Sequence, residues 1–279
     1  MATRANSGIR RRSPVVNGIY YPEGEVALTD LLSSWGLQKG FQARGGQIVV
    51  APHGAWDLTG SIAASAFACL QRSPDGGGIG RVLLLGPCHQ SGEDSIYLSE
   101  SDFFETPLGD LEVDKGLNRK LSSCSTLIST NDIPHLSEHS LEVLLPMVKY
   151  CFPGTQIVPI LMNSRKPLFI SALAKALRIS LETSMEECLI IISSTVSQNF
   201  DPAIAFAMAN EFCSLLEGME ARAFLVGLAE GRISACGGAL LGALFESGLL
   251  SGKRFSAMVP LAQGKGDDGE TVYYRAYGA

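Results

Sequence analysis

Three hydrophobic segments of the chain each lead directly into a cluster of polar residues. They are GGQIVVAPHGAWDLTG (45–60), RVLLLGPCHQSGEDS (81–95) and CLIIISSTVSQNF (188–200). Short, continuous runs of Val, Ile and Leu are typical of strands buried on both faces of a parallel sheet. Parallel strands bring their carboxyl ends to one edge, and open α/β sheets bind ligands in the crevice beyond that edge. We therefore expect the three polar clusters to share one site.

The rest of the chain alternates between helical and extended patterns. A strand is expected near 156–162, extended hairpin-like structure over 96–113, and two late strands joined by GKGDDG (264–269). Apolar residues at helical spacing predict the helices, which are 25–40, 60–70, 114–122, 140–151, 166–183, 203–217 and 237–247. The pattern predicts a single α/β domain.

Composition and charge narrow the class of protein. The chain has 279 residues, 46% of them hydrophobic and 18% charged, with a net charge of −6, which suits a globular protein and does not suit a nucleic-acid binder. The first fourteen residues contain four arginines and no acid, so residues 1–14 are expected to be a disordered basic tail and 15–279 the folded domain.

Neither a membrane segment nor a disulfide framework is expected. No stretch approaches the roughly 18–20 apolar residues that span a bilayer. The seven cysteines are odd in number, lack CxxC spacing and often sit in apolar runs, which favours reduced thiols in a cytoplasmic protein.

Two histidines and one cysteine are candidate metal ligands. His53 and His89 follow the first two buried strands, and Cys236 stands where a helix rich in small residues begins. A helix N-terminus favours the thiolate form; the alternative is that Cys236 is one more inert buried thiol. A donor set of two imidazoles and a thiolate suits Zn, Cu or Fe(II) better than Mg or Ca.

The segment SEHSLEVLLPMV (137–148) admits two interpretations. Ser137, Ser140 and Glu142 have the pattern of a helix start, where acids match the helix dipole. Alternatively, Glu138, His139 and Glu142, the last two of which are three residues apart on one helix face, form a wall of the site or orient the metal ligands.

Six motifs in order resemble the Memo-like family, named for a mediator of ErbB-driven cell motility, whose bacterial members are called AmmeMemoRadiSam system protein B. They are NGIYYP (17–22), APHGAWDLTG (51–60), LLLGPCHQ (83–90), ETPLGDLEVD (105–114), SEHSLEVLLP (137–146) and VYYRAYGA (272–279).

The resemblance implies a fold like that of class III extradiol dioxygenases, with a mixed, mainly parallel sheet flanked by helices. It also implies a site in which His53, His89 and Cys236 bind iron or copper, with Trp56, His139 and Glu142 lining the pocket. A small-molecule or peptide ligand and a radical-SAM partner are the partners that it suggests.

The chain departs from the family pattern after its third strand. Thr195 stands where the family has an aspartate and Gln198 where it has a histidine, and Gln90 replaces the second histidine of the G-P-x-H-H motif. Thr195 and Gln198 are expected in the pocket, where they form hydrogen bonds but do not transfer protons near neutral pH. Two function classes remain open, a metal-dependent oxidoreductase and a non-catalytic binding protein or pseudoenzyme. A zinc hydrolase with Glu142 as general base is a weaker third.

Overall fold

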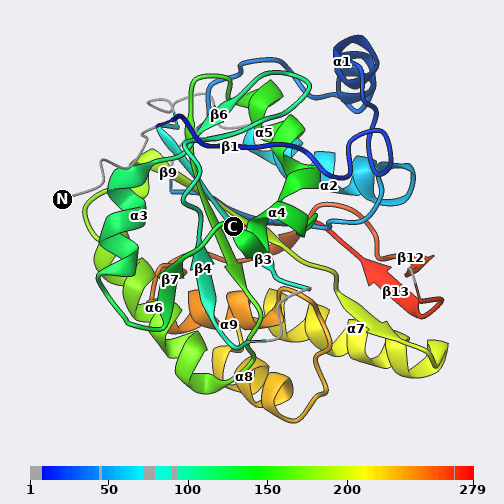
Figure 1. The fold of residues 1–279 in the computed structure, drawn as a ribbon. Helices are drawn as coiled ribbons and strands as arrows, with labels where there is room; N and C mark the ends of the chain where they lie inside the picture. Colours follow the sequence, from blue (N-terminus) through cyan, green and yellow to red (C-terminus); the bar gives the residue numbers. More distant parts are fainter. Residues whose placement is uncertain (1–7, 44–45, 72–78, 90–92, 267) are drawn as a thin grey trace.

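The computed structural model describes residues 8–43, 46–71, 79–89, 93–266 and 268–279 (Figure 1). An eight-stranded mixed sheet forms its centre. In spatial order its strands are β11 (Ser256–Ala257), β14 (Tyr277–Gly278), β2 (Ile48–Ala51), β9 (Cys188–Ser193), β3 (Arg81–Pro87), β8 (Gln156–Met162), β4 (Ile96–Leu98) and β7 (Ile128–Thr130).

The four middle strands, β2, β9, β3 and β8, are parallel, as the three apolar runs predict. The register pairs Ala51 with Ser193 and Leu85 with Ile192. The chain segments that follow β2, β9 and β3 therefore leave the sheet at the same edge.

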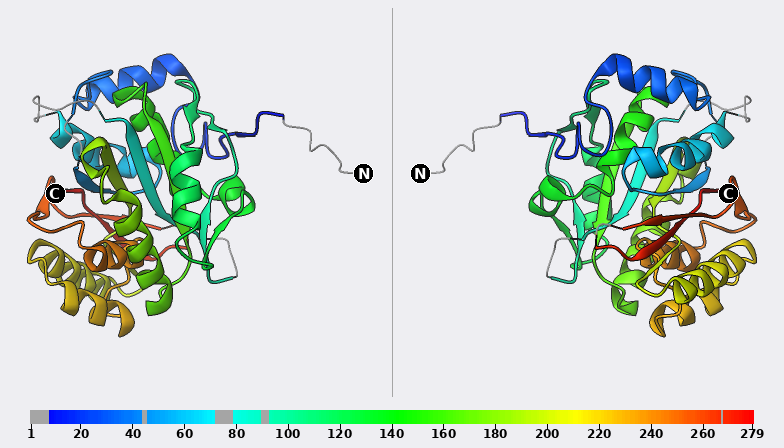
Figure 2. Two further views of the ribbon diagram at one scale, coloured as in Figure 1. Left: turned by 90° about the vertical axis from the view of Figure 1, so that its left-hand side faces the viewer. Right: turned by 90° about the vertical axis from the view of Figure 1, so that its right-hand side faces the viewer.

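Helices cover both faces of this sheet, so alternate side chains of each central strand enter different hydrophobic cores (Figures 1 and 2). Ile48 and Val50 of β2 belong to one core, and Val49 and Ala51 to the other. The first core is closed by α3 (Lys115–Ser122), α6 (Pro167–Leu181), α7 (Pro202–Glu217), α8 (Ala221–Ala229) and α9 (Gly238–Ser247). The second is closed by α1 (Glu25–Ser34), α2 (Trp56–Leu70) and α5 (Leu145–Cys151).

Helix α2 starts at Trp56, four residues before the predicted 60–70, and glycine and proline explain the boundaries of two further predicted helices. Helix α1 stops at Ser34, and Gly36 follows in the left-handed region at φ +80°, a conformation that glycine adopts without strain. The predicted helix 140–151 is divided into the 3₁₀ turn η1 (Glu142–Leu144) and α5, because Pro146 fits only the first turn of a helix. The sequence pattern missed α8 and the short α4 (Ile133–Ser137).

Two small sheets lie beside the main one. One contains β1 (Arg11–Arg12), β5 (Phe103–Phe104) and β6 (Leu111–Glu112), and the other contains β10 (Ser197–Asn199), β13 (Thr271–Tyr274) and β12 (Ala262–Lys265). The antiparallel pairs β5–β6 and β12–β13 confirm the two expected hairpins. In the described part of the chain, no helix has both the length and the apolar character needed to cross a membrane.

The expected disordered tail is wrong for residues 8–14. Arg11 and Arg12 pair with β5, and the Arg12 side chain is 1% exposed. Its guanidinium group forms an ion pair with Glu142 and donates to the carbonyl oxygens of His135 and Glu138 at 2.9 Å each. The part of the predicted tail before residue 8 lies outside the described residues.

Candidate metal centre

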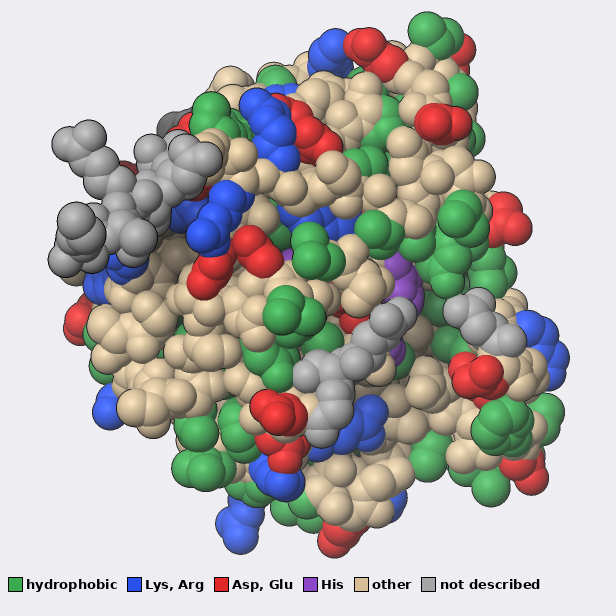
Figure 3. Space-filling view, viewed as in Figure 1, with side chains coloured by type: hydrophobic (Ala, Val, Ile, Leu, Met, Phe, Trp, Pro, Cys, Tyr) green, Lys and Arg blue, Asp and Glu red, His purple; other side chains and the backbone are tan. Residues whose placement is uncertain are grey.

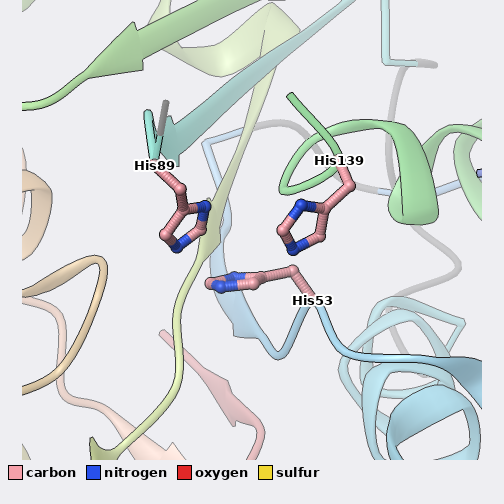
Figure 4. Close-up of side chains that lie close together, drawn as sticks. All are labelled: His53, His89 and His139. Carbon is pink, nitrogen blue, oxygen red and sulfur yellow. The ribbon is translucent and has the colours of Figure 1, made fainter. Parts of the chain in front are cut away.

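Three histidines from three separate segments converge on one space (Figure 4). His53 lies two residues beyond β2, His89 two residues beyond β3, and His139 between α4 and η1. One ring nitrogen from each lies within 4.8 Å of the others. The sequence predicted that His53 and His89 meet. It placed His139 in the pocket wall, and the structure brings its ring into the same cluster.

His53 is held in one orientation and one tautomer by Ser193, the last residue of β9. The Ser193 hydroxyl donates its only hydrogen to the Ser140 carbonyl oxygen at 2.6 Å, so it accepts from His53 Nδ1 at 2.8 Å. Nδ1 of His53 therefore carries a proton that is committed to Ser193, which leaves Nε2 as the ring nitrogen for a metal. A ligating histidine typically shows this arrangement.

Glu138 plays the corresponding part for His89. This carboxylate is 2% exposed and accepts from the His89 backbone N–H at 2.5 Å, from His89 Nδ1 at 3.0 Å and from the Ser140 backbone N–H at 2.8 Å. Oε1 of Glu138, which accepts from the His89 ring and from Ser140, also lies 3.5 Å from His139 Nδ1. Although burial raises the pKa of a carboxyl group, the hydrogen bonds and charge of His89 lower the pKa of Glu138 to about 2.

Cys236 comes just before α9 and faces the end of the third central strand. Its Sγ lies 3.3 Å from Thr195 Oγ1, which donates to it, and 3.3 Å from Gln198 Oε1. Its backbone N–H donates to Thr195 Oγ1 at 3.2 Å. Thr195 and Gln198 thus lie beside the thiol, where the sequence placed them.

The thiol and His89 shift each other's protonation. Burial raises the pKa of Cys236, but hydrogen bonds with His53 and His89 outweigh it and lower the pKa to about 5. Burial lowers the pKa of His89, but hydrogen bonds with Cys236 and Glu138 raise it to about 10. Each group thus favours the charged form of the other.

These groups line an open pocket of about 590 Å³, and histidine side chains are visible through its mouth (Figure 3). His53, His89, His139, Thr195, Gln198 and Cys236 all contribute to it. The opposite wall comes from the β12–β13 hairpin, which adds Lys265 and Glu270.

Two predicted pocket residues lie elsewhere. Glu142 is 1% exposed, and its carboxylate is occupied by Arg12, the backbone N–H groups of Val15 and Val16, and the Tyr21 hydroxyl. It anchors the N-terminal segment and does not line the pocket.

Trp56, the second of these, starts α2 and is 4% exposed. Its Nε1 donates to the Val143 carbonyl oxygen at 2.9 Å, which turns the ring toward a neighbouring cavity. The predicted substitution at Gln90 lies outside the described residues.

Sequence reasoning missed the supporting role of Ser193, and it grouped Glu138 with His139 and Glu142 without identifying the ligand that Glu138 orients. Ser193 ends the third apolar run and pairs with Ala51, which lies two residues before His53. The expected pairing of these strands was therefore a signal that Ser193 lies near His53. Glu138 directly precedes His139, but nothing in the sequence indicated that it contacts His89, 49 residues away.

Comparison with known proteins agrees with this fold and indicates the family. A MEMO1 family protein of Thermotoga neapolitana is 28% identical over 242 residues, which cover 81% of this chain and 84% of that protein. Another, from Desulfurococcus amylolyticus, is 28% identical over 210 residues, 70% of this chain and 71% of that protein.

Among solved structures, an uncharacterized protein from Escherichia coli K12 superimposes with a TM-score of 0.53 over 83% of this chain and 98% of its own, at 12% identity, which shows likeness of fold alone. The model of the family described as Memo-like protein matches residues 12–259. The chain therefore belongs to the Memo-like protein family.

Proposed function

We propose that this protein binds iron or copper at the histidine cluster and uses the adjoining pocket for redox chemistry on a small molecule. The observation that carries the proposal is the convergence of His53, His89 and His139, each offering a ring nitrogen within 4.8 Å of the other two. Cys236, predicted as a ligand, lines the same pocket and would add a sulfur donor, but the group of described residues whose atoms all lie within 4.8 Å of one another comprises the three histidines without it. Imidazole and thiolate suit iron, copper and zinc, and carboxylate-preferring ions such as Mg²⁺ and Ca²⁺ are poor matches.

The three nitrogens are near enough to share one metal after a small movement of the side chains. Three ligands that each bind at about 2.1 Å lie roughly 3.4–3.6 Å apart in tetrahedral or trigonal geometry. Nitrogens that start within 4.8 Å of one another therefore need to close by at most about 1.4 Å. Ser193 and Glu138 already occupy the Nδ1 atoms of His53 and His89, which leaves their Nε2 atoms for the metal.

The residues of this chain have distinct tasks in the proposal. His53, His89 and His139, with Cys236, would hold the ion, and a bound iron or copper ion supplies one-electron redox chemistry. Thr195 donates a hydrogen bond to the sulfur, which tempers its negative charge. The pocket beyond the cluster admits the reacting molecule from the side of the β12–β13 hairpin.

A non-catalytic binding protein is the alternative, and one observation favours it. Thr195 and Gln198, the two groups nearest the thiol, donate or accept hydrogen bonds but do not exchange protons near neutral pH. The zinc-hydrolase alternative loses its general base, because Glu142 is buried in its ion pair with Arg12.

Metal analysis tests the proposal directly. Protein purified without chelator or added metal is expected to carry stoichiometric iron or copper. The substitutions His89→Ala and Cys236→Ser should lower this metal content sharply. Cys124→Ser, at a thiol outside the pocket, is the matched control and should keep the parent content. Zinc alone, or no metal after reconstitution with Fe(II) and Cu, would contradict the proposal.

Activity is tested separately. The double substitution Thr195→Asp and Gln198→His restores an acid and a base beside the cluster, and such groups typically contribute about 10²–10⁴-fold to a rate. A rise in oxygen consumption at unchanged metal content supports a missing proton relay. An active parent that the double substitution leaves unchanged shows that these positions do not limit its chemistry.

A further inference from the structure

A second cavity adjoins the histidine pocket. It has a volume of about 650 Å³ and shares Tyr20, Ala55 and Asp57 with that pocket, so the two cavities lie side by side. The Tyr20 ring lies between them, with its centroid 5.2 Å from that of His139 in an edge-on arrangement. Tyr20 therefore forms part of the wall of both cavities.

The second cavity, called here the aromatic groove, is lined by Tyr20, Tyr21, Trp35 and Trp56. The Trp56 ring centroid lies 5.5 Å from Tyr21 and 5.4 Å from Trp35. Trp56 is fixed by its hydrogen bond to Val143, and Tyr21 by its hydroxyl bond to Glu142. The groove is thus bordered by aromatic rings whose positions are set by the core.

Trp35 is positioned by the absence of a side chain on α2. A Cβ atom at Gly60 would lie 2.3 Å from Trp35 Cη2, so only glycine lets the indole pack there. Trp35 remains half-buried, which leaves part of the ring open to a ligand. Gly60, in the second turn of α2, therefore helps to form the groove.

Asp57 is the one charged side chain among the described residues that line the aromatic groove. It is exposed, and within the described part of the chain no ion pair engages it. Aromatic faces attract cations through their quadrupole, and a carboxylate attracts them through its charge. Both features of the groove favour a positively charged ligand over a neutral or anionic one.

We propose that the aromatic groove binds an organic cation of the arylalkylammonium class, with its ring against Tyr20 and Trp35 and its ammonium group near Asp57. This inference rests on the proposed function in one respect only: it takes the bound cation to be the molecule that reacts at the histidine cluster. The binding itself does not require a metal.

The chain provides its own reporter for this binding. Its two tryptophans, Trp35 and Trp56, both line the groove, so all tryptophan fluorescence comes from this place. We would titrate the protein, as purified and after chelator treatment, with phenethylammonium chloride, with the neutral 2-phenylethanol and with the anionic 3-phenylpropionate.

Phenethylammonium is expected to change the fluorescence saturably and to bind more tightly than the alcohol, with the anion weakest. Asp57→Asn should weaken the cation roughly two- to fivefold and leave the alcohol unchanged, as expected for an exposed charge pair. Asp30→Asn removes an equally exposed aspartate from nearby α1, outside the groove, and should keep the parent preference.

Equal binding of the cation and the alcohol, or a preference that survives Asp57→Asn, would overturn the inference. Metal content measured on the same samples separates the two proposals. If the parent carries no iron or copper but still prefers the cation, the proposed function is wrong and the groove proposal stands. If the parent carries the metal but shows no preference for the cation, the groove proposal is wrong and the metal-binding proposal stands.

Discussion

Substitution of Glu138 should show whether this residue orients the metal ligands or only stabilises the fold. Glu138 receives hydrogen bonds from the His89 backbone, the His89 ring and the Ser140 backbone, and it is almost completely buried. Glu138→Gln keeps the size of the side chain but replaces one carboxylate oxygen by an NH₂ group. That NH₂ group then faces N–H donors in place of an acceptor.

The size of the effect follows from these contacts. A hydrogen bond to a charged group contributes about 1.5–3 kcal/mol, and residues that orient metal ligands typically change metal affinity about 10–100-fold. For Glu138→Gln we expect a loss of metal affinity in that range, which corresponds to about 1.4–2.7 kcal/mol. The low pKa of Glu138, about 2, keeps the parent carboxylate ionised throughout the pH range of the assay.

Competition with a chromophoric chelator measures this affinity in the parent and the variant, and thermal unfolding of the metal-free proteins measures stability in parallel. Glu112→Gln is the matched control, because Glu112 is an exposed glutamate on β6. A Glu138→Gln protein that unfolds earlier but binds metal as tightly as the parent would refute the reasoning, since Glu138 would then support the fold alone.

Three further predictions concern single residues. Gly237→Ala places a Cβ atom 2.6 Å from the Ser193 carbonyl oxygen, a backbone atom that cannot move aside, so the free energy of unfolding should fall by about 1–3 kcal/mol in chemical denaturation. Arg12→Met leaves its buried carboxylate partner without a counter-charge and should cost about 3–5 kcal/mol, whereas Arg10→Met, in an exposed ion pair, should cost no more than about 1 kcal/mol. In metal-free protein, the rate of Cys236 alkylation by iodoacetamide should reach half its plateau near pH 5, because the reactive thiolate forms as the pH rises through the pKa of Cys236. A midpoint near the ordinary thiol pKa of about 8.5 would contradict this.

The convergence of His53 and His89 was predictable from the sequence, because it depends on strands that the hydrophobic pattern identifies. Both residues follow continuous apolar runs, and parallel pairing brings the ends of those runs to one edge. Thr195 was placed by the same argument. Cys236 followed from the helix that starts after it.

His139 and Glu142 show where a local pattern fails. The interval of three residues suggested a shared helix face, but α4 ends at Ser137 and the 3₁₀ turn begins at Glu142, so the helical rule does not apply to His139. The position of His139 depends instead on contacts of the 138–140 segment with the ends of β3 and β9, which are distant in the sequence.

Arg12 was missed for a similar reason. A cluster of arginines without acids normally belongs to a solvated segment. Here one guanidinium group finds Glu142, 130 residues away, together with two carbonyl oxygens, and is fully buried by them. No local pattern distinguishes Arg12 from Arg10 or Arg11, because the difference lies entirely in the partners.

The position of the three histidines relative to one another depends on Ser140, a residue that is itself fully buried. Its N–H donates to the Glu138 carboxylate at 2.8 Å, its hydroxyl to the Pro87 carbonyl oxygen at 2.7 Å, and its carbonyl oxygen accepts from Ser193 at 2.6 Å. The supports of His89, His53 and His139 are therefore connected through one residue. A Cβ atom at Gly86 would lie 2.8 Å from the Ser140 hydroxyl oxygen, so the end of β3 must carry glycine for this connection to form. The geometry of the cluster is thus fixed by the meeting of strand ends, before any ligand binds.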